Sequence, residues 1–347
     1  MKQIKIALVD PPLSGHKLRG TGIYTLELYK ALQKQKEVIV SLVDIKSDFS
    51  AFDIVHYPYF DPFFLTLPII KKKPTVVTVH DLIPLKFPKY FPKGIRGEIK
   101  WRIQKFSLRD SQAIITDSFA SKKDIISYTG ISENKINVAY LGVKEEFKLI
   151  KSQGILNDIR KKYNLPEKFV LYVGDVNYNK NIEGIIKAFL GVLDKITDIN
   201  LVLVGKGFID DTVQLRNAEK YIYQLGLEKK VKKLGFIALS DLVGVYNLAA
   251  VYLQPSFAEG FGLGVLEAMA CGCPVVTSNT SSLPELVKDA AILVNPNDSL
   301  EISKSIIKFI NDINIRNNFI ERGLKRVKNF TWKKCAQETV KIYRNIL

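Results

Sequence analysis

Two glutamates eight residues apart flank a glycine-rich helix start, and this combination, rather than the spacing alone, is suited to binding a polar, phosphorylated ligand. Glu259 and Glu267 lie in the stretch SFAEGFGLGVLEAMACGCPVV, in which Gly260, Gly262 and Gly264 lead from a strand into a helix. Backbone amides at a helix start have no acceptor within the helix, so they can bind a diphosphate. The two carboxylates can each accept hydrogen bonds from pairs of sugar hydroxyls. The segment therefore predicts a site for a sugar diphosphate.

A lysine at the start of another helix indicates the same kind of ligand. Lys180 precedes Asn181 in GDVNYNKNIEGIIKAF, directly after a strand that ends at Asp175. The helix dipole repels a cation at this end, so a lysine is favoured here when an anion shares the site. A solvated lysine on the first helical turn is the alternative interpretation.

The N-terminal half contains two further candidates at strand ends. Gly20-Thr21-Gly22 lies where the first helix begins, and small residues there allow backbone amides to approach a phosphate. His80, followed by Asp81, ends the strand TVVTVHD and can orient a substrate hydroxyl or an anion. His56 ends another strand, and we expect it to be a structural residue. The chain has neither a G-x-G-x-x-G fingerprint nor a P-loop, which argues against a nicotinamide oxidoreductase or a P-loop kinase.

The elements that must position these residues follow an alternating pattern. Short β-branched runs alternate with amphipathic stretches, which predicts parallel sheets with helices on both faces. One such series occupies residues 1–146, and a second occupies residues 147–330. We therefore expect two doubly wound α/β domains in tandem, with a last helix over 331–347. Ligands of such sheets bind outside the carboxyl ends of the strands, where the candidate residues lie.

Composition limits the class of protein. The 347 residues are 47% hydrophobic and 25% charged, with a net charge of +16, which excludes intrinsic disorder and indicates an anionic partner. No apolar run approaches the length of a membrane span, and Asp10-Pro11-Pro12 interrupts the N-terminal run too early for a signal peptide. We expect a cytoplasmic protein that begins with a strand. Of the three cysteines, Cys271 and Cys273 lack the spacing of a metal or redox motif, so we expect buried core residues.

The glutamate segment resembles the E-x7-E motif of the retaining nucleotide-sugar glycosyltransferases of family 4. The segments GTGIYTLEL, TVHDLIPLKFP, YVGDVNYNKN, LVLVGKG and FTWKKCAQETVKIY extend the similarity over nearly the whole chain. The resemblance implies the GT-B fold, in which two Rossmann-like domains face each other across a cleft. It also implies that the final helix packs back on the N-terminal domain.

The resemblance implies roles for individual residues. Glu259 resembles the residue that holds hydroxyls of the transferred sugar, and Glu267 the residue that binds the nucleotide ribose. Lys180 resembles the cationic partner of the diphosphate, and His80 a histidine near the sugar and acceptor. The resemblance thus implies that Glu259, Lys180 and His80 are catalytic. The donor-binding residues that it implies are Gly20, Gly22, Lys180, Gly205, Phe236, Ile237, Glu259, Phe261, Gly262, Leu263 and Glu267.

One position departs from the family pattern. Many members carry an arginine directly after the strand glycine, and here that position is Asp175. An acidic group would repel a diphosphate, so we expect Asp175 to point away or to bind another group. Arg19 and Lys206 are candidates for the missing positive charge.

The expected reaction is transfer of a hexose to a glycan or lipid-linked glycan acceptor. No Asp-x-Asp occurs in the chain, so we expect no metal and no other cofactor, with Lys180 and helix amides stabilising the diphosphate. GDP-mannose is the leading donor, because TVHDLIPLKFPKYFP resembles members that build polysaccharide or O-antigen chains. UDP-glucose and UDP-N-acetylglucosamine remain open, as do a sugar-nucleotide 2-epimerase of the same fold and a basic nucleic-acid-binding protein. The distribution of charge disfavours a nucleic-acid-binding protein. Residues 1–146 contain 23 basic and 15 acidic side chains, which is only half of the net positive charge of +16.

A basic and aromatic stretch suggests peripheral attachment to the inner face of a membrane. Between Lys86 and Arg109, eight basic residues alternate with Phe87, Tyr90, Phe91, Trp101 and Phe106. Such a combination at helical spacing suits an anionic lipid surface. A solvated helix with a buried aromatic face is the alternative.

Overall fold

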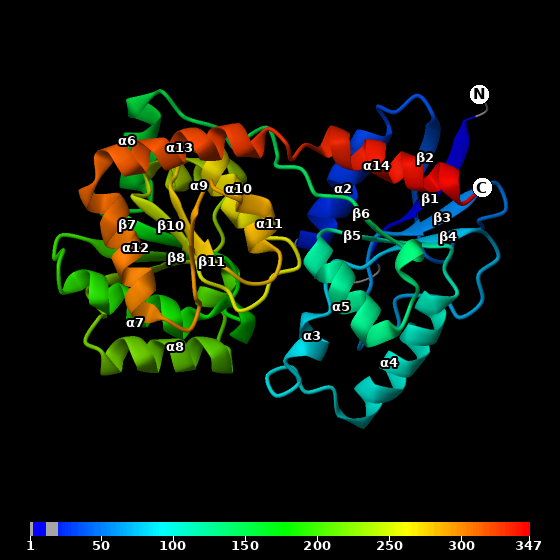
Figure 1. The fold of residues 1–347 in the computed structure, drawn as a ribbon, viewed down its shortest axis with the longest axis horizontal. Coiled ribbons are helices and arrows are strands. Elements are labelled where there is room, and N and C mark those ends of the chain that lie inside the picture. The colour runs from blue at the N-terminus through cyan, green and yellow to red at the C-terminus, as the bar shows by residue number, and fades with distance from the viewer. Residues whose placement is uncertain (1–2, 12–19) are drawn as a thin grey trace. The chain divides into compact units, whose positions relative to one another are not determined.

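The chain forms two compact α/β units (Figure 1). The computed structural model describes residues 3–11 and 20–347. Unit 1 contains residues 1–142 and 330–347, and unit 2 contains residues 143–329. The C-terminal segment thus returns to the unit that contains the N-terminus.

Unit 1 is built on six parallel strands in the order β2-β1-β3-β4-β5-β6. Because the connections reverse direction between β1 and β3, the carboxyl ends of these strands flank a crevice of the kind that binds ligands. A small hollow lies there, lined by residues that include Val9, Asp10, Tyr57 and Tyr59. The elements are β1 (Ile4–Val9), α2 (Gly20–Leu32), β2 (Val38–Val43), β3 (Ile54–Tyr57), β4 (Thr75–Thr78), α3 (Ile83–Lys86), α4 (Gly94–Arg109), β5 (Ala113–Thr116), α5 (Phe119–Thr129), the 3-10 turn η1 (Glu133–Lys135), β6 (Ile136–Val138) and α14 (Trp332–Asn345).

Unit 2 also has six parallel strands, in the order β12-β11-β10-β7-β8-β9. This is the Rossmann order, and it reverses between β7 and β10. The elements are α6 (Gln153–Lys162), β7 (Phe169–Val173), η2 (Tyr178–Lys180), α7 (Ile182–Leu193), β8 (Asn200–Val204), η3 (Lys206–Phe208), α8 (Val213–Gln224), β9 (Val231–Leu234), α9 (Leu239–Leu248), β10 (Val251–Gln254), α10 (Leu263–Ala270), β11 (Val275–Ser278), α11 (Leu283–Val287), β12 (Ile292–Val294), α12 (Ser299–Asn311) and α13 (Ile313–Val327). The prediction of two doubly wound α/β domains is confirmed.

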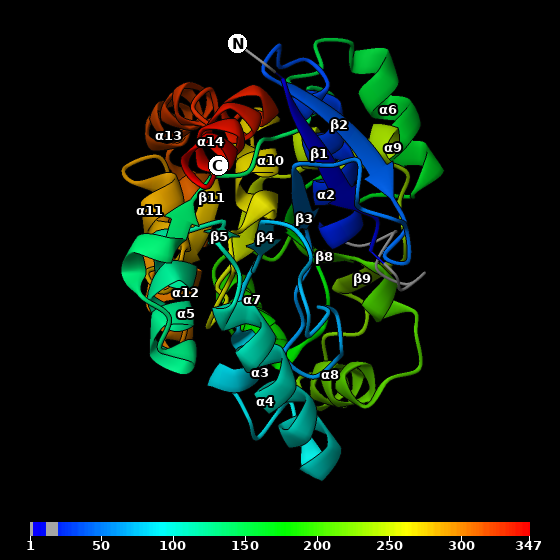
Figure 2. The same ribbon diagram turned by 90° about the vertical axis from the view of Figure 1, so that its right-hand side faces the viewer.

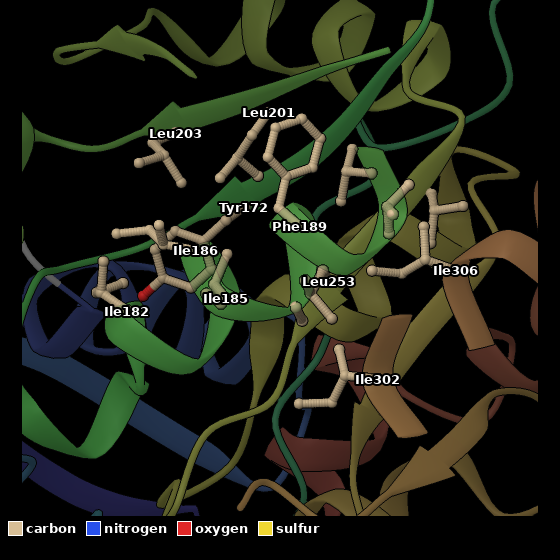
Figure 3. Packing of buried hydrophobic residues seen from close by; sticks show 14 of the residues in the cluster. Tyr172, Ile182, Ile185, Ile186, Phe189, Leu201, Leu203, Leu253, Ile302 and Ile306 are labelled. Atoms are coloured by element: carbon tan, nitrogen blue, oxygen red, sulfur yellow. The ribbon is translucent and has the colours of Figure 1, made fainter. Parts of the chain in front are cut away.

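The core of unit 2 shows why its strands, apart from β9 (VKKL), are largely apolar. Ile185, Ile186 and Phe189 point from α7 toward Leu201 and Leu203 of β8 (Figure 3), and all five side chains are fully buried. Helices cover both faces of the sheet, so alternate strand residues are also buried rather than exposed. Long β-branched and leucine runs therefore form the strands, and the strand ends are left as the sites where polar side chains lie.

Helix α14 is anchored to unit 1 by buried polar contacts. It packs against α2, as Figure 1 shows, and its Tyr343 hydroxyl lies 2.6 Å from His56 Nδ1. His56 Nε2 lies 2.8 Å from Thr78 Oγ1, and the Tyr24 hydroxyl lies 3.0 Å from the same oxygen. All four side chains are buried. The expected structural role of His56 agrees with this network, because both ring nitrogens are occupied within the core.

The His56 network predicts a pH-dependent stability of unit 1. Burial lowers the pKa of His56 to about 3, with a smaller contribution from the charge of His80, whereas an unfolded histidine titrates near about 6.5. The unfolded chain therefore binds the proton first, and stability is full above pH about 6.5 and falls toward pH about 3 at up to about 1.4 kcal/mol per pH unit. We expect His56→Gln to be less stable than wild type at pH 7 but to lose stability less steeply on acidification.

Tryptophan fluorescence during urea unfolding measures this effect selectively. The chain has two tryptophans, Trp101 and Trp332, and both lie in unit 1. Tyr343→Phe is the matched control, since it removes a hydrogen bond of the network and keeps His56, so its stability should decline with the wild-type slope. Equal slopes in wild type and His56→Gln between pH 7 and pH 5 would contradict the prediction.

Candidate active site

Lys180 and Glu259 follow the two strands between which the unit 2 sheet reverses. Lys180 lies in the loop between β7 and α7, and Glu259 lies in the loop between β10 and α10. β7 and β10 are adjacent parallel strands, so their carboxyl ends lie at the same edge of the sheet. The strand order thus brings together two residues that are 79 positions apart in the sequence.

The two side chains form a close ion pair. Lys180 Nζ lies 2.9 Å from Oε1 and 2.7 Å from Oε2 of Glu259. The Glu259 side chain is 7% exposed and that of Lys180 is 22% exposed. A buried carboxylate is costly unless it is paired and hydrogen-bonded, so the lysine stabilises the ionised glutamate. The site therefore holds a cation and an anion side by side.

Two neutral donors also bind the Glu259 carboxylate, and the sequence analysis did not identify them. Gln254 Nε2 donates to Oε1 over 2.8 Å, and Ser256 Oγ donates to the same oxygen over 2.6 Å. Both residues are buried. Their position in the sequence could have indicated them, because both are polar residues at the end of an otherwise apolar run.

Side-chain amides connect the loops after β7 and β10. Asn179 Nδ2 donates to the carbonyl of Ala258, and the amide of Phe257 donates to the carbonyl of Asn179. Asn181 caps α7 and donates from Nδ2 to the carbonyls of Pro255 and Pro296. These bonds fix Lys180 relative to Glu259, because they bind the residues on either side of the lysine.

The start of α10 lies directly after Glu259. Gly262 caps the helix with φ +118°, a conformation that favours glycine, and Leu263 is its first residue. The Phe261 carbonyl accepts a hydrogen bond from Ser282, which also donates to the carbonyl of Glu259. The predicted diphosphate-binding residues Phe261, Gly262 and Leu263 are therefore brought next to the ion pair.

Glu267 lies further along α10, in a partly buried position. The Tyr246 hydroxyl donates to its Oε2 over 3.1 Å. Burial raises the pKa of Glu267 to about 7, although the Tyr246 hydrogen bond and the charge of Lys144 act in the opposite direction. This carboxyl group is thus able to change its charge near neutral pH.

Other predicted ligand residues lie at the ends of β8 and β9. Gly205 has φ +150°, and a Cβ there would lie 1.9 Å from the carbonyl oxygen of Gly174, so no larger residue fits without a backbone shift. Phe236 is exposed, whereas Ile237 is buried. Both follow β9, at the same edge of the sheet as Lys180.

The departure at Asp175 has a local explanation. Asp175 Oδ1 accepts a hydrogen bond from the amide of Val176, and Oδ2 accepts one from Asn177 Nδ2. The carboxylate thus binds groups of its own loop. Lys206 is exposed next to Gly205, and Arg19 lies outside the described residues.

In unit 1 the predicted residues lie on separate elements. His80 follows β4, its Nδ1 lies 2.6 Å from Asp117 Oδ2, and its Nε2 lies 3.2 Å from the carbonyl oxygen of Pro58. Burial lowers the pKa of His80, but the charge and hydrogen bond of Asp117, together with smaller contributions from Asp81 and the Pro58 carbonyl, raise the pKa overall. Both partners are acceptors, which suits the doubly protonated ring. Gly20 and Gly22 lie in the first turn of α2, where Gly22 is buried.

The arrangement in unit 2 can bind a phosphorylated polyol. It combines a lysine, the amide end of a helix and two carboxylates, whereas residues 3–11 and 20–347 contain no group of three His, Cys, Asp or Glu side chains that could hold a metal ion. The sequence analysis missed Gln254, Ser256 and, in unit 1, Asp117. Asp117 could have been found as the acidic residue that ends the strand next to that of His80.

Known proteins resemble this chain in sequence and fold. Residues 157–326 match the model "Glycosyl transferases group 1", and residues 38–147 match "Glycosyltransferase Family 4". The O-antigen chain mannosyltransferase B of Escherichia coli is 32% identical over 78% of this chain and 70% of its own length. The serotype-specific mannosyltransferase WbdA of Escherichia coli is 29% identical over 79% of this chain, but the match spans only 34% of that relative. The HepE protein of Anabaena, solved in complex with UDP and glucose, has the same fold with a TM-score of 0.80 at 19% identity over 99% of this chain and all of its own.

Proposed function

This chain is a glycosyltransferase that belongs to group 1 and family 4, with the GT-B fold, and from this premise we propose that it transfers mannose from GDP-mannose to a glycan or lipid-linked glycan acceptor with retention of configuration. The observation that carries the proposal is the ion pair of Lys180 and Glu259 at the β7/β10 switch point, beside the start of α10. A nucleotide sugar has a diphosphate and a hydroxylated ring, and these are the groups that a lysine and a carboxylate bind.

In this mechanism the charged groups act on the departing diphosphate and on the sugar. Lys180 and the first amides of α10 stabilise negative charge as the diphosphate leaves. Glu259 accepts hydrogen bonds from sugar hydroxyls and stabilises the positive charge of the oxocarbenium-like ring. The acceptor attacks from the face that the diphosphate leaves, and the leaving phosphate takes the acceptor proton, so no separate base is required. His80, held by Asp117 and Pro58, is proposed to bind the sugar or the acceptor.

Mannose is the leading sugar because relatives of this chain are named as mannosyltransferases of O-antigen chains. UDP-glucose is the principal alternative, since HepE, a structural neighbour, is complexed with UDP and glucose. Glu267 would bind the ribose that both donors share, so it does not select between them.

We also propose that α4 and the loop beside it attach unit 1 to an anionic membrane surface. Among the described residues, no helix is long and apolar enough to cross a membrane. Trp101 is buried in the core of unit 1, so the aromatic residues of the stretch do not all face outward. Ile95, Ile99 and Phe106 are exposed instead, and their spacing puts them on one face of α4.

The neighbouring loop packs on the buried side of α4 and has exposed apolar residues of its own. Gln104 of α4 accepts a hydrogen bond from the amide of Thr66, and Ser107 donates to the carbonyl of Pro68, so the loop lies along the helix. α4 lies at the periphery of unit 1 in Figures 1 and 2. The exposed apolar residues of this α4 surface are Phe64, Leu65, Ile69, Ile70, Ile95, Ile99 and Phe106. The basic residues within or beside these segments in the sequence are Lys72, Lys73, Lys93, Arg96, Lys100 and Arg102, of which Lys93 and Arg102 pair with Glu98 and Lys100 lies over the Phe64 ring. Exposed apolar side chains and basic residues on the same segments suit the interface of an anionic lipid layer.

One experiment tests both the proposed donor, GDP-mannose, and the proposal that the reaction needs no metal ion. Nucleotide release from GDP-mannose, UDP-glucose and UDP-N-acetylglucosamine is measured with and without EDTA. We expect the fastest release from GDP-mannose and no loss of rate with the chelator, because Lys180 and helix amides neutralise the diphosphate. Faster release from a UDP-sugar would contradict GDP-mannose as the donor. A loss of activity with EDTA that Mg²⁺ or Mn²⁺ restores would contradict the role of Lys180.

The two glutamates should differ in their effects. We expect Glu259→Gln to slow the chemical step with little change in affinity for GDP, and Glu267→Gln to weaken GDP binding by about 1–3 kcal/mol, the scale of a hydrogen bond to a charged group. Single-turnover kinetics and calorimetry measure the two effects, with Glu228→Gln as an exposed control.

The pH dependence of GDP binding adds a second readout for Glu267. The ionised carboxylate accepts hydrogen bonds from ribose hydroxyls, so wild-type affinity should fall as the pH is lowered from 8 to 6, through the Glu267 pKa of about 7. Glu267→Gln should lack this part of the dependence. Equal losses of GDP affinity in both glutamine variants, with an intact chemical step in Glu259→Gln, would refute the assigned roles.

Flotation tests the α4 surface. We expect wild type to float with phosphatidylglycerol vesicles at low salt and to remain at the bottom with neutral phosphatidylcholine vesicles. Ile95→Ser with Phe106→Ser should reduce flotation, because two apolar contacts with the lipid are lost. Val213→Ser, at an exposed valine of unit 2, is the matched control. Wild-type protein that stays at the bottom with both lipids would overturn the proposal.

A further inference from the structure

A series of buried side chains holds the Glu259 carboxylate in addition to Lys180. Gln254 and Ser256 both donate to Oε1, which also lies 2.9 Å from Lys180 Nζ. Among the described residues, Oε2 has Lys180 Nζ as its hydrogen-bond partner, at 2.7 Å. The two oxygens of one carboxylate therefore have unequal surroundings.

The orientation of the Gln254 amide is itself fixed by a neighbour. The Tyr252 hydroxyl donates to Gln254 Oε1 over 2.7 Å, so the carbonyl end of the amide faces Tyr252 and the Nε2 end faces Glu259. An amide turned the other way would direct its oxygen at a carboxylate oxygen, which is repulsive. Tyr252 and Gln254 are both buried, so water does not substitute for these contacts.

The backbone of α10 packs directly on this pair. A Cβ at Gly264 would lie 2.4 Å from the Tyr252 hydroxyl and 3.1 Å from Gln254 Oε1. Burial, followed by the charges of Glu267 and Glu259, raises the pKa of Tyr252 well above its usual value. The hydroxyl is thus a neutral hydrogen-bond donor.

We infer that Tyr252, Gln254 and Ser256 form a positioning relay, which saturates Oε1 of Glu259 and presents Oε2 to Lys180 and to the hydroxyls of the donor sugar. The inference rests on the proposed function for the identity of the ligand. Tyr252 determines the orientation of the Gln254 amide, and Gln254 and Ser256 determine the orientation of the Glu259 carboxylate. Without the relay the Glu259 side chain is held by Lys180 alone, and its ionised form loses two hydrogen-bond donors in a buried site.

Kinetics of relay variants test the inference. Gln254→Met keeps the length of the side chain without its amide, and the Tyr252 hydroxyl retains the Val173 carbonyl at 3.3 Å as an acceptor. We expect Gln254→Met and Ser256→Ala to lower kcat by about tenfold or more, the effect of losing one hydrogen bond to a charged group. GDP affinity should change less than about twofold, because the relay does not touch the nucleotide in the proposed complex. Tyr252→Phe should have a smaller effect on kcat.

The pH profile separates positioning from general destabilisation. Loss of a hydrogen-bond donor to Glu259 disfavours its ionised form. The acid limb of the pH profile of kcat should therefore move to higher pH in Gln254→Met and Ser256→Ala. Ser303→Ala is the matched control, since Ser303 is a buried serine of unit 2 that donates to the Leu300 carbonyl. Its acid limb and kcat should equal those of wild type. An unmoved acid limb with normal kcat in both relay variants would overturn the inference.

A second arm of the test, a stability measurement, requires no nucleotide sugar. Lys180→Met is combined with Ser256→Ala, and urea unfolding is followed by circular dichroism, which reports unit 2 as well as the tryptophan-containing unit 1. We expect the midpoint of the double variant to fall by more than the sum of the single shifts, because Glu259 then loses its cation and a donor together. Additive shifts would overturn the relay. If wild type releases nucleotide from none of the donors, the proposed function fails, and this arm still decides the relay.

Discussion

A carboxylate taken out of water requires partners, and this requirement organises the site of unit 2. An unpaired ionised group in the interior costs several kcal/mol, so Glu259 is tolerated only because other groups surround it. Lys180 comes from the loop after β7, and Gln254 and Ser256 come from the end of β10 and the loop after it. The loop after β11 contributes Ser281 and Ser282, which bind the Glu259 backbone. Three neighbouring strand ends are thus connected through one residue.

The ion pair also constrains how a ligand can enter. Under the proposed function, the diphosphate of the donor becomes a partner of Lys180, and sugar hydroxyls become partners of Glu259. Donor binding then exchanges one internal ion pair for two interactions with the ligand, and neither charge is left unpaired. The charge that develops on the departing diphosphate strengthens its attraction to Lys180, which is how a preorganised cation favours a transition state over a ground state.

Unit 1 illustrates the same dependence of charge on surroundings with two histidines at the ends of neighbouring strands. His56 has hydroxyl partners only, and burial lowers its pKa to about 3. His80 is also largely buried, but the Asp117 carboxylate lies 2.6 Å from its ring and the pKa is raised. One histidine is therefore a neutral core residue that anchors α14, and the other is suited to carry charge at the edge of the sheet. Both residues are histidines, and their different hydrogen-bond partners account for the opposite shifts in pKa.

The sequence by itself determined the fold class and the identity of the chemical groups. The periodicity of β-branched runs predicted both parallel sheets, and the E-x7-E segment with Lys180 predicted a phosphorylated sugar, because these signals are local in the chain. Only the tertiary structure decided which groups meet. The strand order joins Lys180 to Glu259 across 79 positions, puts Asp117 beside His80, and buries Trp101 while Ile95 and Phe106 stay exposed. Those outcomes depend on strand pairing and helix packing between segments distant in sequence, and no local pattern encodes such pairing.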